Sequence, residues 1–264
     1  MDPLLSIAID AARQAGKVMV RYIDRLDAIR VDQKGHNDFV TEVDKSCEQV
    51  IIQTIQKKYP NHRILAEESG LIEKDNQADV TWIIDPLDGT TNYIHGFPHF
   101  AVSIAARYKN QLQQGVIYDP LRDELFSAGR GQGAKLNDRR IRVSARLQLN
   151  DALLGTSFSC RIPEAELPAY FHVIQRLGSQ AVGLRRAGSA ALDLAYVATG
   201  RLDGFWEVGL KIWDMAAGVL LIKEAGGMVS DNKGNEDYLN TGSIIAGNPK
   251  IFKAVLAVVR EKFS

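Results

Sequence analysis

The pattern of apolar and polar residues predicts a chain that mixes helices with strands. In several stretches the apolar residues recur at helical spacing, and end signals frame some of these stretches. Asp2 followed by Pro3 is typical of a helix start, and Thr41 with Asp44 three residues later resembles a capping box. The pair Gly226-Gly227 stops a later helix. We therefore predict helices over residues 3–22, 41–58, 163–177, 189–199, 214–225 and 249–263.

Short apolar runs bounded by turn residues predict strands between these helices. The runs 100–108 and 112–118 flank Lys109-Asn110-Gln111 and predict a hairpin. The glycine-rich segment 129–133 mimics a phosphate-binding loop, but it lacks the strand-to-helix setting and the Lys-Ser/Thr ending, so we interpret it as a turn. The predicted strands cover residues 63–66, 80–84, 100–108, 112–118, 124–128, 141–144, 153–158, 204–207 and 243–246.

The pattern of predicted secondary structure changes near residue 150, from mostly strands to alternating helices and strands. This change predicts a mixed α/β (α+β) protein with an N-terminal lobe, residues 1–150, and a C-terminal lobe, residues 151–264. No repeat or low-complexity linker separates the lobes. We therefore expect them to share an interface and to form one compact unit.

Composition and charge exclude several classes of protein. The 264 residues are 45% hydrophobic and 24% charged, which is ordinary for a globular protein. Lys and Arg balance Asp and Glu at 32 each, so net charge gives no reason to infer direct binding to DNA or to a membrane surface. No run approaches the ~20 apolar residues of a membrane span, and the N-terminus lacks a signal-peptide pattern. The two cysteines, Cys47 and Cys160, do not make a disulfide framework. A cytoplasmic protein is expected.

Four carboxylates fall at the ends of predicted elements, where side chains from distant segments can converge. They are Glu67, Asp85, Asp88 and Asp214. Converging acids repel one another unless a cation lies among them, and Mg²⁺ favours a few carboxylates together with water and phosphate. The lack of His and Cys in this set argues against zinc. Taken singly, each acid has an ordinary explanation, such as a solvated pair for Glu67-Glu68 or a helix N-cap for Asp214.

The segment 85–91 reads Asp-Pro-Leu-Asp-Gly-Thr-Thr and combines several features of a metal and phosphate site. Its two acids could reach neighbouring metals from one turn, past a proline that forbids a regular strand, and the Leu87 carbonyl could fill a further ligand position. Gly89 allows close backbone approach, and a helix that starts after it would direct amides toward an anion. Thr90 could orient a water. Asp-Gly alone would indicate a hairpin turn, but the preceding acid, the threonines and the apolar strand favour a site.

For several other polar residues the sequence gives weaker evidence of a functional role. Arg185-Arg186 could bind phosphate, although a solvated or interface pair is the more ordinary interpretation. His95 and His99 flank the motif, and we expect neither to be a ligand or catalytic. Glu207 could be a surface residue of a short strand, and Asp44 could do no more than stabilise its helix N-terminus.

Several segments of the chain resemble the inositol monophosphatase family, in the family's own order. Trp-Ile-Ile-Asp-Pro-Leu-Asp-Gly-Thr-Thr-Asn at 82–92 resembles the first family signature, and Trp-Asp-Met-Ala-Ala-Gly at 213–218, continuing through 224–227, resembles the second. Segments 38–44 and 67–69 support them. The tract Arg-Arg-Ala-Gly-Ser-Ala-Ala-Leu-Asp-Leu-Ala-Tyr at 185–196 is closest to the bacterial SuhB-type branch. The match covers nearly the whole chain and is weaker between about residues 159 and 183.

The resemblance implies a layered α/β/α/β/α sandwich, shared with fructose-1,6-bisphosphatase, and usually a homodimer. It implies a phosphatase that depends on Mg²⁺ and is inhibited by Li⁺. The metal ligands that it implies are Glu67, Asp85, the Leu87 carbonyl, Asp88 and Asp214.

The resemblance also implies roles in catalysis and substrate binding. Glu67 and Thr90 would position the attacking water, and Asp44 would support Thr90. Glu207 would accept hydrogen bonds from inositol hydroxyls. The implied substrate contacts are Leu87, Asp88, Gly89, Thr90, Gly188, Ser189, Ala190, Glu207 and Asp214.

The resulting prediction is hydrolysis of inositol 1-phosphate by a metal-activated water. No covalent intermediate is expected, because no residue has the pattern of an activated nucleophile. The same chemistry on another small ester stays open: fructose 1,6-bisphosphate, 3′-phosphoadenosine 5′-phosphate, histidinol phosphate or glycerol 2-phosphate. A function of another class also stays open. Bacterial members of this branch are associated with transcription during ribosomal RNA synthesis, so RNA polymerase or its elongation factors are candidate partners.

Overall fold

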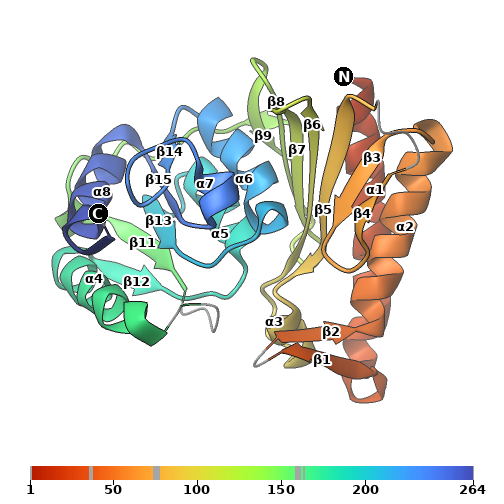
Figure 1. The fold of residues 1–264 in the computed structure, drawn as a ribbon, viewed down its shortest axis with the longest axis horizontal. Coiled ribbons are helices and arrows are strands. Elements are labelled where there is room, and N and C mark those ends of the chain that lie inside the picture. Colours follow the sequence, from red (N-terminus) through yellow and green to blue (C-terminus); the bar gives the residue numbers. More distant parts are fainter. Residues whose placement is uncertain (1, 36–37, 74–77, 158–161, 163, 264) are drawn as a thin grey trace.

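Two β-sheets alternate with three layers of helices, which makes the layered α/β/α/β/α sandwich that was predicted (Figure 1). The computed structural model describes residues 2–35, 38–73, 78–157, 162 and 164–263. Each helix layer is a pair. The pairs are α1 (Pro3–Tyr22) with α2 (Glu42–Lys58), α5 (Ala190–Ala198) with α6 (Ile212–Glu224), and α4 (Leu167–Gln180) with α8 (Pro249–Phe263).

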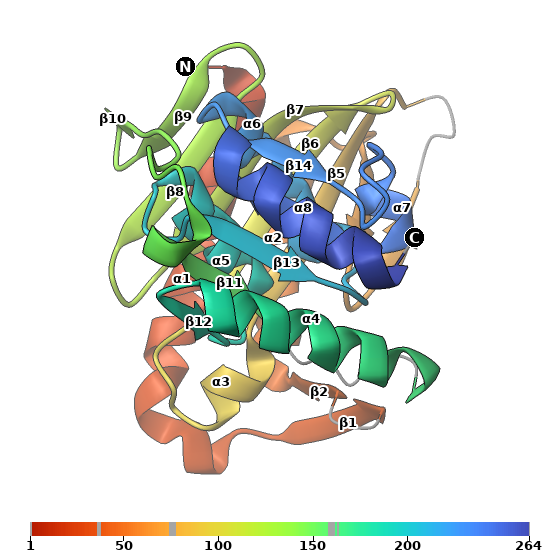
Figure 2. The same ribbon diagram turned by 90° about the vertical axis from the view of Figure 1, so that its left-hand side faces the viewer.

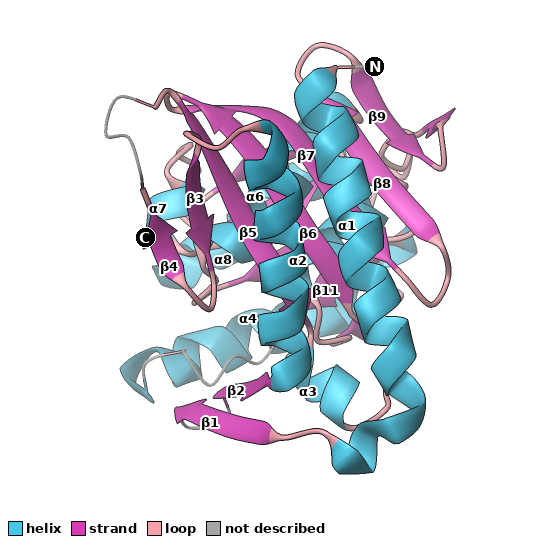
Figure 3. Ribbon diagram, turned by 90° about the vertical axis from the view of Figure 1, so that its right-hand side faces the viewer, coloured by secondary structure: helices cyan, strands magenta, loops and turns pink. Residues whose placement is uncertain are grey.

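The larger sheet has eight strands in the order β10-β9-β8-β7-β6-β5-β3-β4, and α1 and α2 cover its outer face (Figure 3). Neighbouring strands are antiparallel except β3 and β5, which are parallel. The bounds are β3 (Arg63–Ala66), β4 (Gly70–Ile72), β5 (Val80–Asp88), β6 (Ala101–Tyr108), β7 (Gln111–Asp119), β8 (Glu124–Gly129), β9 (Gly133–Leu136) and β10 (Arg139–Arg140). The predicted hairpin is confirmed as β6 and β7.

The smaller sheet has five strands in the order β12-β11-β13-β15-β14, and α4 and α8 lie over its outer face (Figure 2). Its strands are β11 (Leu153–Thr156), β12 (Gly183–Arg185), β13 (Gly204–Glu207), β14 (Met228–Ser230) and β15 (Ile244–Gly247). The short elements outside both sheets are the hairpin β1 (Val31–Gly35) and β2 (Asp38–Thr41), the helices α3 (Thr90–Ile94) and α7 (Tyr238–Thr241), and 3₁₀ turns at Ile23–Ala28, Leu149–Asp151 and Glu164–Glu166.

The central helix pair is deeply buried because sheets lie on both of its sides. Every residue of α6 from Asp214 to Ile222 is buried, as expected for a helix that is apolar on all faces. Close packing requires glycine at two positions. A Cβ on Gly218 would lie 2.5 Å from Leu194 Cβ, and one on Gly115 would lie 3.0 Å from the Ala217 carbonyl oxygen. These contacts fix α6 against α5 and against the larger sheet.

Local signals in the sequence explain the helix ends. Asp2 Oδ1 accepts a hydrogen bond from the Leu4 N–H at 2.8 Å, and Thr41 with Asp44 forms the predicted capping box. The glycine-rich segment 129–133 is a turn, as predicted. Its Gly131 and Gly133 N–H groups donate to the Glu224 carboxylate at 2.8 Å each. The anion that this turn binds is therefore the chain's own carboxylate.

Three predictions of local structure were wrong. Residues 141–144 form no strand, because this segment packs its apolar side chains on the central core while it crosses between the sheets, and Val143 N–H bonds to the Ala225 carbonyl. Strand β5 continues past Pro86 to Asp88, with a break in register after Asp85. Helix α6 begins at Ile212 and not at Asp214, which is its third residue.

Some sequence predictions are not tested by this fold. Three of these predictions lie outside the described residues: the strand end at Phe158, the helix start at Pro163 and the position of Cys160. The other cysteine, Cys47, is buried. The division into lobes 1–150 and 151–264 stays a prediction, since the largest core cluster takes residues from both. Among the described residues, no helix combines the length and the apolar character needed to cross a bilayer.

Candidate active site

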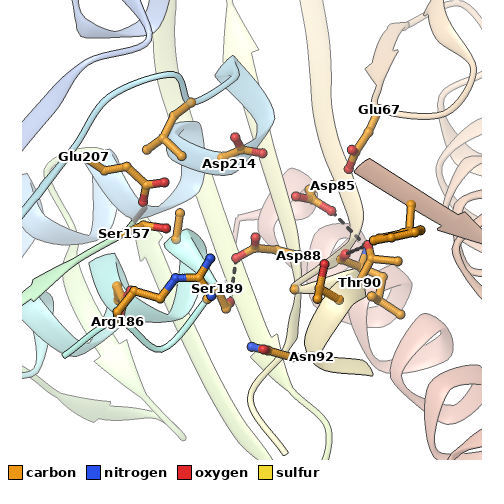
Figure 4. A pocket seen from close by; sticks show the side chains of 18 of the residues that line it. Glu67, Asp85, Asp88, Thr90, Asn92, Ser157, Arg186, Ser189, Glu207 and Asp214 are labelled. Carbon is orange, nitrogen blue, oxygen red and sulfur yellow. Dashed lines mark hydrogen bonds between the residues drawn. The ribbon is translucent and has the colours of Figure 1, made fainter. Parts of the chain in front are cut away.

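A cavity of about 520 Å³ opens between the larger sheet and the C-terminal part of the chain. Of the predicted site residues, Asp44 alone does not line this cavity, and it lies directly behind Thr90. Figure 4 shows Glu67, Asp85 and Thr90 on one side, Glu207, Ser157 and Arg186 on the other, and Asp88 and Asp214 between them. The wall residues that sequence reasoning singled out are Glu67, Asp85, Leu87, Asp88, Gly89, Thr90, Gly188, Ser189, Ala190, Glu207 and Asp214.

The end of β5 holds the first acid, Asp85. Its Oδ1 accepts a hydrogen bond from the Leu87 N–H at 3.0 Å, which fixes the carboxylate over its own turn. The backbone then turns sharply at Gly89, whose φ of +97° favours glycine. A Cβ there would lie 3.0 Å from the His99 carbonyl oxygen and 3.3 Å from that of Gly188. Gly89 is therefore required both by backbone conformation and by space.

Asp88 joins the two sides of the cavity. Its Oδ2 accepts hydrogen bonds from Ser189 Oγ at 2.6 Å and from the Ala191 N–H at 2.7 Å, so it satisfies the N-terminus of α5. Asn92 makes a second connection, because its Nδ2 donates to the carbonyl oxygens of His99 at 2.7 Å and Ala187 at 2.8 Å. These bonds explain how a loop after β5 and the tract before α5 line one cavity.

Thr90 is held by Asp44, the acid of the capping box on α2. Thr90 Oγ1 lies 3.0 Å from Asp44 Oδ1 and 3.1 Å from the Leu87 carbonyl oxygen. The other oxygen of Asp44 accepts hydrogen bonds from both the backbone and the side chain of Thr41. Asp44 is thus oriented toward Thr90 by its helix cap. The structure places the two residues in contact, and the supporting role of Asp44 stays a prediction.

The remaining two acids come from distant elements. Asp214 lies in the first turn of α6, and its Oδ2 accepts a hydrogen bond from the Lys211 N–H at 2.7 Å. Glu67 follows β3. The adjacent loop is anchored because buried Glu48 on α2 accepts hydrogen bonds from the Glu68 N–H and the Ser69 hydroxyl. Each acid therefore has a rigid element behind it.

Burial and the neighbouring acids raise the pKa of two of these carboxylates, Asp85 and Asp88. Burial, and then repulsion from Glu67, Asp88 and Asp214, holds the pKa of Asp85 well above its usual range. Burial and repulsion from Asp214 raise the pKa of Asp88 to about 7, although its hydrogen bonds to α5 oppose the shift. Such a cluster is unfavourable by itself at neutral pH, and a cation among the acids would relieve the repulsion.

The donor set fits a hard divalent cation. The candidate ligands are carboxylates and one carbonyl, all oxygen donors of the kind that Mg²⁺ prefers. Within the described part of the chain, no three acidic, His or Cys side chains close into a ready-made cage. Mg²⁺ does not need one, because it usually takes one or two carboxylates and completes its shell with water and phosphate.

Sequence reasoning missed part of the cavity wall. Asp193 and Ser157 were not predicted, and Arg186, judged a solvated or interface residue, lines the cavity. Ser157 hydrogen-bonds to Glu207, which is buried rather than on the surface, and burial holds the pKa of Glu207 well above its usual range. A charged residue inside the apolar run 190–198 was a usable signal for Asp193, since a helix apolar on all faces is buried.

Comparison with known proteins shows the family to which this chain belongs. The model of the inositol monophosphatase family matches residues 1–263. The Nus factor SuhB of Pseudomonas aeruginosa is 54% identical over 262 residues, which cover 98% of this chain and 97% of that protein. The crystal structure of extragenic suppressor protein SuhB from Bartonella henselae has a TM-score of 0.95 at 42% identity, and covers 98% of this chain and 99% of that one. Inositol monophosphatase from Anabaena has a TM-score of 0.86 at 40% identity, over 98% and 96%.

The fold and the cavity define a layered sandwich protein with an acid-lined site suited to a divalent metal. The chain belongs to the inositol monophosphatase family, which is a family of phosphatases that use metal ions. The roles of the individual site residues stay predictions, as does the expectation that His95 and His99 have no role in ligation or catalysis.

Proposed function

We propose that this chain is a Mg²⁺-dependent, cytoplasmic phosphomonoesterase that hydrolyses inositol 1-phosphate to inositol and phosphate, and that it acts as a homodimer. One observation supports the chemistry above the others. Four carboxylates from three separate segments line the same cavity as Thr90, which is itself held by Asp44. Structural packing alone gives no reason to gather so many acids around one opening.

Glu67, Asp85, the Leu87 carbonyl, Asp88 and Asp214 would hold the metal ions in this proposal. Bound Mg²⁺ would supply positive charge that lowers the pKa of water and neutralises charge on the phosphate and the leaving alkoxide. The chain's own contribution is to fix the ligands. Backbone N–H groups hold one oxygen of Asp85, Asp88 and Asp214 in place, so the carboxylates need little reorganisation.

Thr90 and Glu67 would position the attacking water. A hydroxyl donates only one hydrogen, and the Asp44 carboxylate is a stronger acceptor than the Leu87 carbonyl. Thr90 therefore donates toward Asp44 and keeps its own lone pairs as acceptors for a water on the cavity side. Glu67 would accept the other hydrogen of that water and so direct its oxygen toward phosphorus.

The opposite side of the cavity would take the leaving group. Glu207 is buried at the end of β13, carries a hydrogen bond from Ser157 and lines the cavity. A carboxylate in this position can accept hydrogen bonds from ring hydroxyls. The backbone from Gly188 to Ala190, together with Gly89 and Thr90, would line the phosphate and sugar positions. Such hydroxyl contacts favour inositol 1-phosphate over less hydroxylated esters.

A panel of esters at saturating Mg²⁺ tests this proposal. We expect phosphate release from inositol 1-phosphate with a kcat/KM about tenfold or more above those for histidinol phosphate, glycerol 2-phosphate, 3′-phosphoadenosine 5′-phosphate and fructose 1,6-bisphosphate. A chelator should reduce release to background, and Li⁺ should inhibit it. Faster release from another ester would assign the same site to that ester. If no phosphate is released from any of these esters, the phosphatase proposal is wrong.

A second function, binding within a transcription complex, is favoured by one specific observation. The 54% identical relative from Pseudomonas aeruginosa carries the name Nus factor SuhB. We infer that this chain also associates with RNA polymerase or its elongation factors. Tagged protein, isolated from cells with and without nuclease treatment, should retain these proteins above a tag-only control. Their absence from both preparations would count against the binding role.

A further inference from the structure

Asp193 is a buried carboxylate in the cavity wall that none of the proposed steps uses. It lies in the first turn of α5 with 2% of its surface exposed, yet it lines the cavity. Its side chain sits over β11, since a Cβ placed on Gly155 would be 3.7 Å from Asp193 Cγ. Within the described part of the chain, its carboxylate accepts no hydrogen bond. Buried carboxylates normally have donors around them, whereas among the described residues none donates a hydrogen bond to this one, which lines the cavity.

The charges around Asp193 place it at the leaving-group side. Among the neighbouring acids, Asp193 has the largest effect on the pKa of Glu207. Burial is the main cause of the raised pKa of Asp193 itself. Asp88 raises this pKa further, and Arg186 lowers it. Figure 4 shows that Glu207 and Arg186 lie across the cavity from Thr90. Two buried acids and one exposed cation therefore surround the space where the leaving group would lie.

A structural role for Asp193 is the ordinary alternative, because acids stabilise the first turn of a helix. That role is already filled in α5. Ser189 caps the helix by accepting from the Leu192 N–H, and the Asp88 carboxylate accepts from the Ala191 N–H. A further buried charge without a donor would weaken the fold rather than strengthen it.

We propose that Asp193 is a second hydroxyl acceptor which, with Glu207, selects a neutral polyol as the leaving group and disfavours one that carries its own phosphate. This inference rests on the proposed phosphatase function. A carboxylate only accepts hydrogen bonds, and a polyol offers hydroxyl donors that satisfy it. A second phosphate is anionic and offers only acceptors, so two carboxylates repel it, and the exposed Arg186 offsets one of them at most.

The test compares three esters on the full chain at saturating Mg²⁺: inositol 1-phosphate, cyclohexyl phosphate, which has the same ring without the hydroxyls, and fructose 1,6-bisphosphate. We expect Asp193→Asn to lower kcat/KM for inositol 1-phosphate about tenfold or more. The kcat/KM of this variant for cyclohexyl phosphate should change less than about twofold, since that ester makes no hydroxyl contact. The ratio of fructose 1,6-bisphosphate to inositol 1-phosphate turnover should rise because one repulsive charge is gone.

Two further variants keep the result interpretable. Asp193→Ala removes the acceptor completely and should give the same selectivity change, should the asparagine variant fold poorly. Asp203→Asn is the matched control. Asp203 is equally buried, but it binds the Leu153 N–H and Arg146 away from the cavity, so its loss should leave the substrate ratios unchanged.

The outcomes separate this inference from the proposal on which it rests. An equal loss for inositol 1-phosphate and cyclohexyl phosphate in both Asp193 variants would make Asp193 structural and overturn the inference. Unchanged ratios would overturn it as well, while leaving the phosphatase proposal intact. If wild-type protein hydrolyses none of the three esters, the phosphatase proposal itself fails.

Discussion

Replacing Asp88 with asparagine is expected to abolish Mg²⁺-dependent phosphate release from inositol 1-phosphate while leaving the fold intact. The expected loss in kcat is about 10³-fold or more, or ~4 kcal/mol in the barrier. The hydrogen bonds of Asp88 explain why an isosteric change has so large an effect. Ser189 Oγ and the Ala191 N–H both donate to Oδ2, so the amide oxygen of asparagine must take that position. The amide nitrogen, a donor, then takes the other position of the carboxyl group and repels a cation.

The fold of the Asp88→Asn variant can be checked by its stability in metal-free buffer. Because the pKa of Asp88 is raised to about 7 in the fold from an ordinary value of 3.8, wild-type protein binds more protons folded than unfolded between these values. Its stability therefore falls as pH rises from about 4 through about 7. Asparagine does not ionise, so this part of the pH dependence should disappear. We expect a Tm at pH 8 equal to or above that of wild type.

A deletion strain separates catalysis from binding in the same variant. If phosphatase activity is the physiological role, Asp88→Asn should fail to restore growth to a strain that lacks the gene. Rescue by the inactive protein would place the role in binding partners. Full turnover by purified Asp88→Asn protein would instead contradict the metal-site assignment.

Long elements with end signals could be predicted from the sequence because local energetics decide them. Helix α1 begins at Pro3 after its Asp2 cap, and α8 spans Pro249–Phe263 as predicted. The strands that were missed depend on their partners. Strand β12 has only three residues and is paired with β11 alone. Residues 141–144 show the opposite error, since their alternation reflects packing on the core and not pairing.

The site could be predicted where its residues are adjacent in the chain and not where only the fold joins them. Asp85, Asp88 and Thr90 lie in one motif, and the motif as a whole indicates a metal and phosphate site. Asp193 is surrounded in sequence by alanine and leucine, and only the packing of α5 over β11 brings its carboxylate to the cavity. The direction of a side chain on a helix that is buried on all faces is set by tertiary contacts, which a single sequence does not contain.

The Thr90 hydroxyl is the other position at which a small change should have a large effect. Thr90→Val keeps the shape of the side chain but removes the oxygen between Asp44 and Leu87. The attacking water loses an acceptor, and we expect kcat to fall about 10²- to 10³-fold with little change in KM, because the group acts on the transition state rather than on substrate binding. Steady-state kinetics on inositol 1-phosphate measures both constants.

Thr90→Ser is the matched control, because it retains the hydroxyl and loses only a methyl group. It should keep kcat within about tenfold of wild type, since the bond to Asp44 can still form. The valine variant leaves Asp44 Oδ1 without the Thr90 donor, while Thr41 still satisfies the other oxygen. Activity in the serine variant and not in the valine variant would therefore assign the effect to the hydroxyl. If the valine variant turns over as fast as wild type, Thr90 does not position the water, and Asp44 serves only its helix cap.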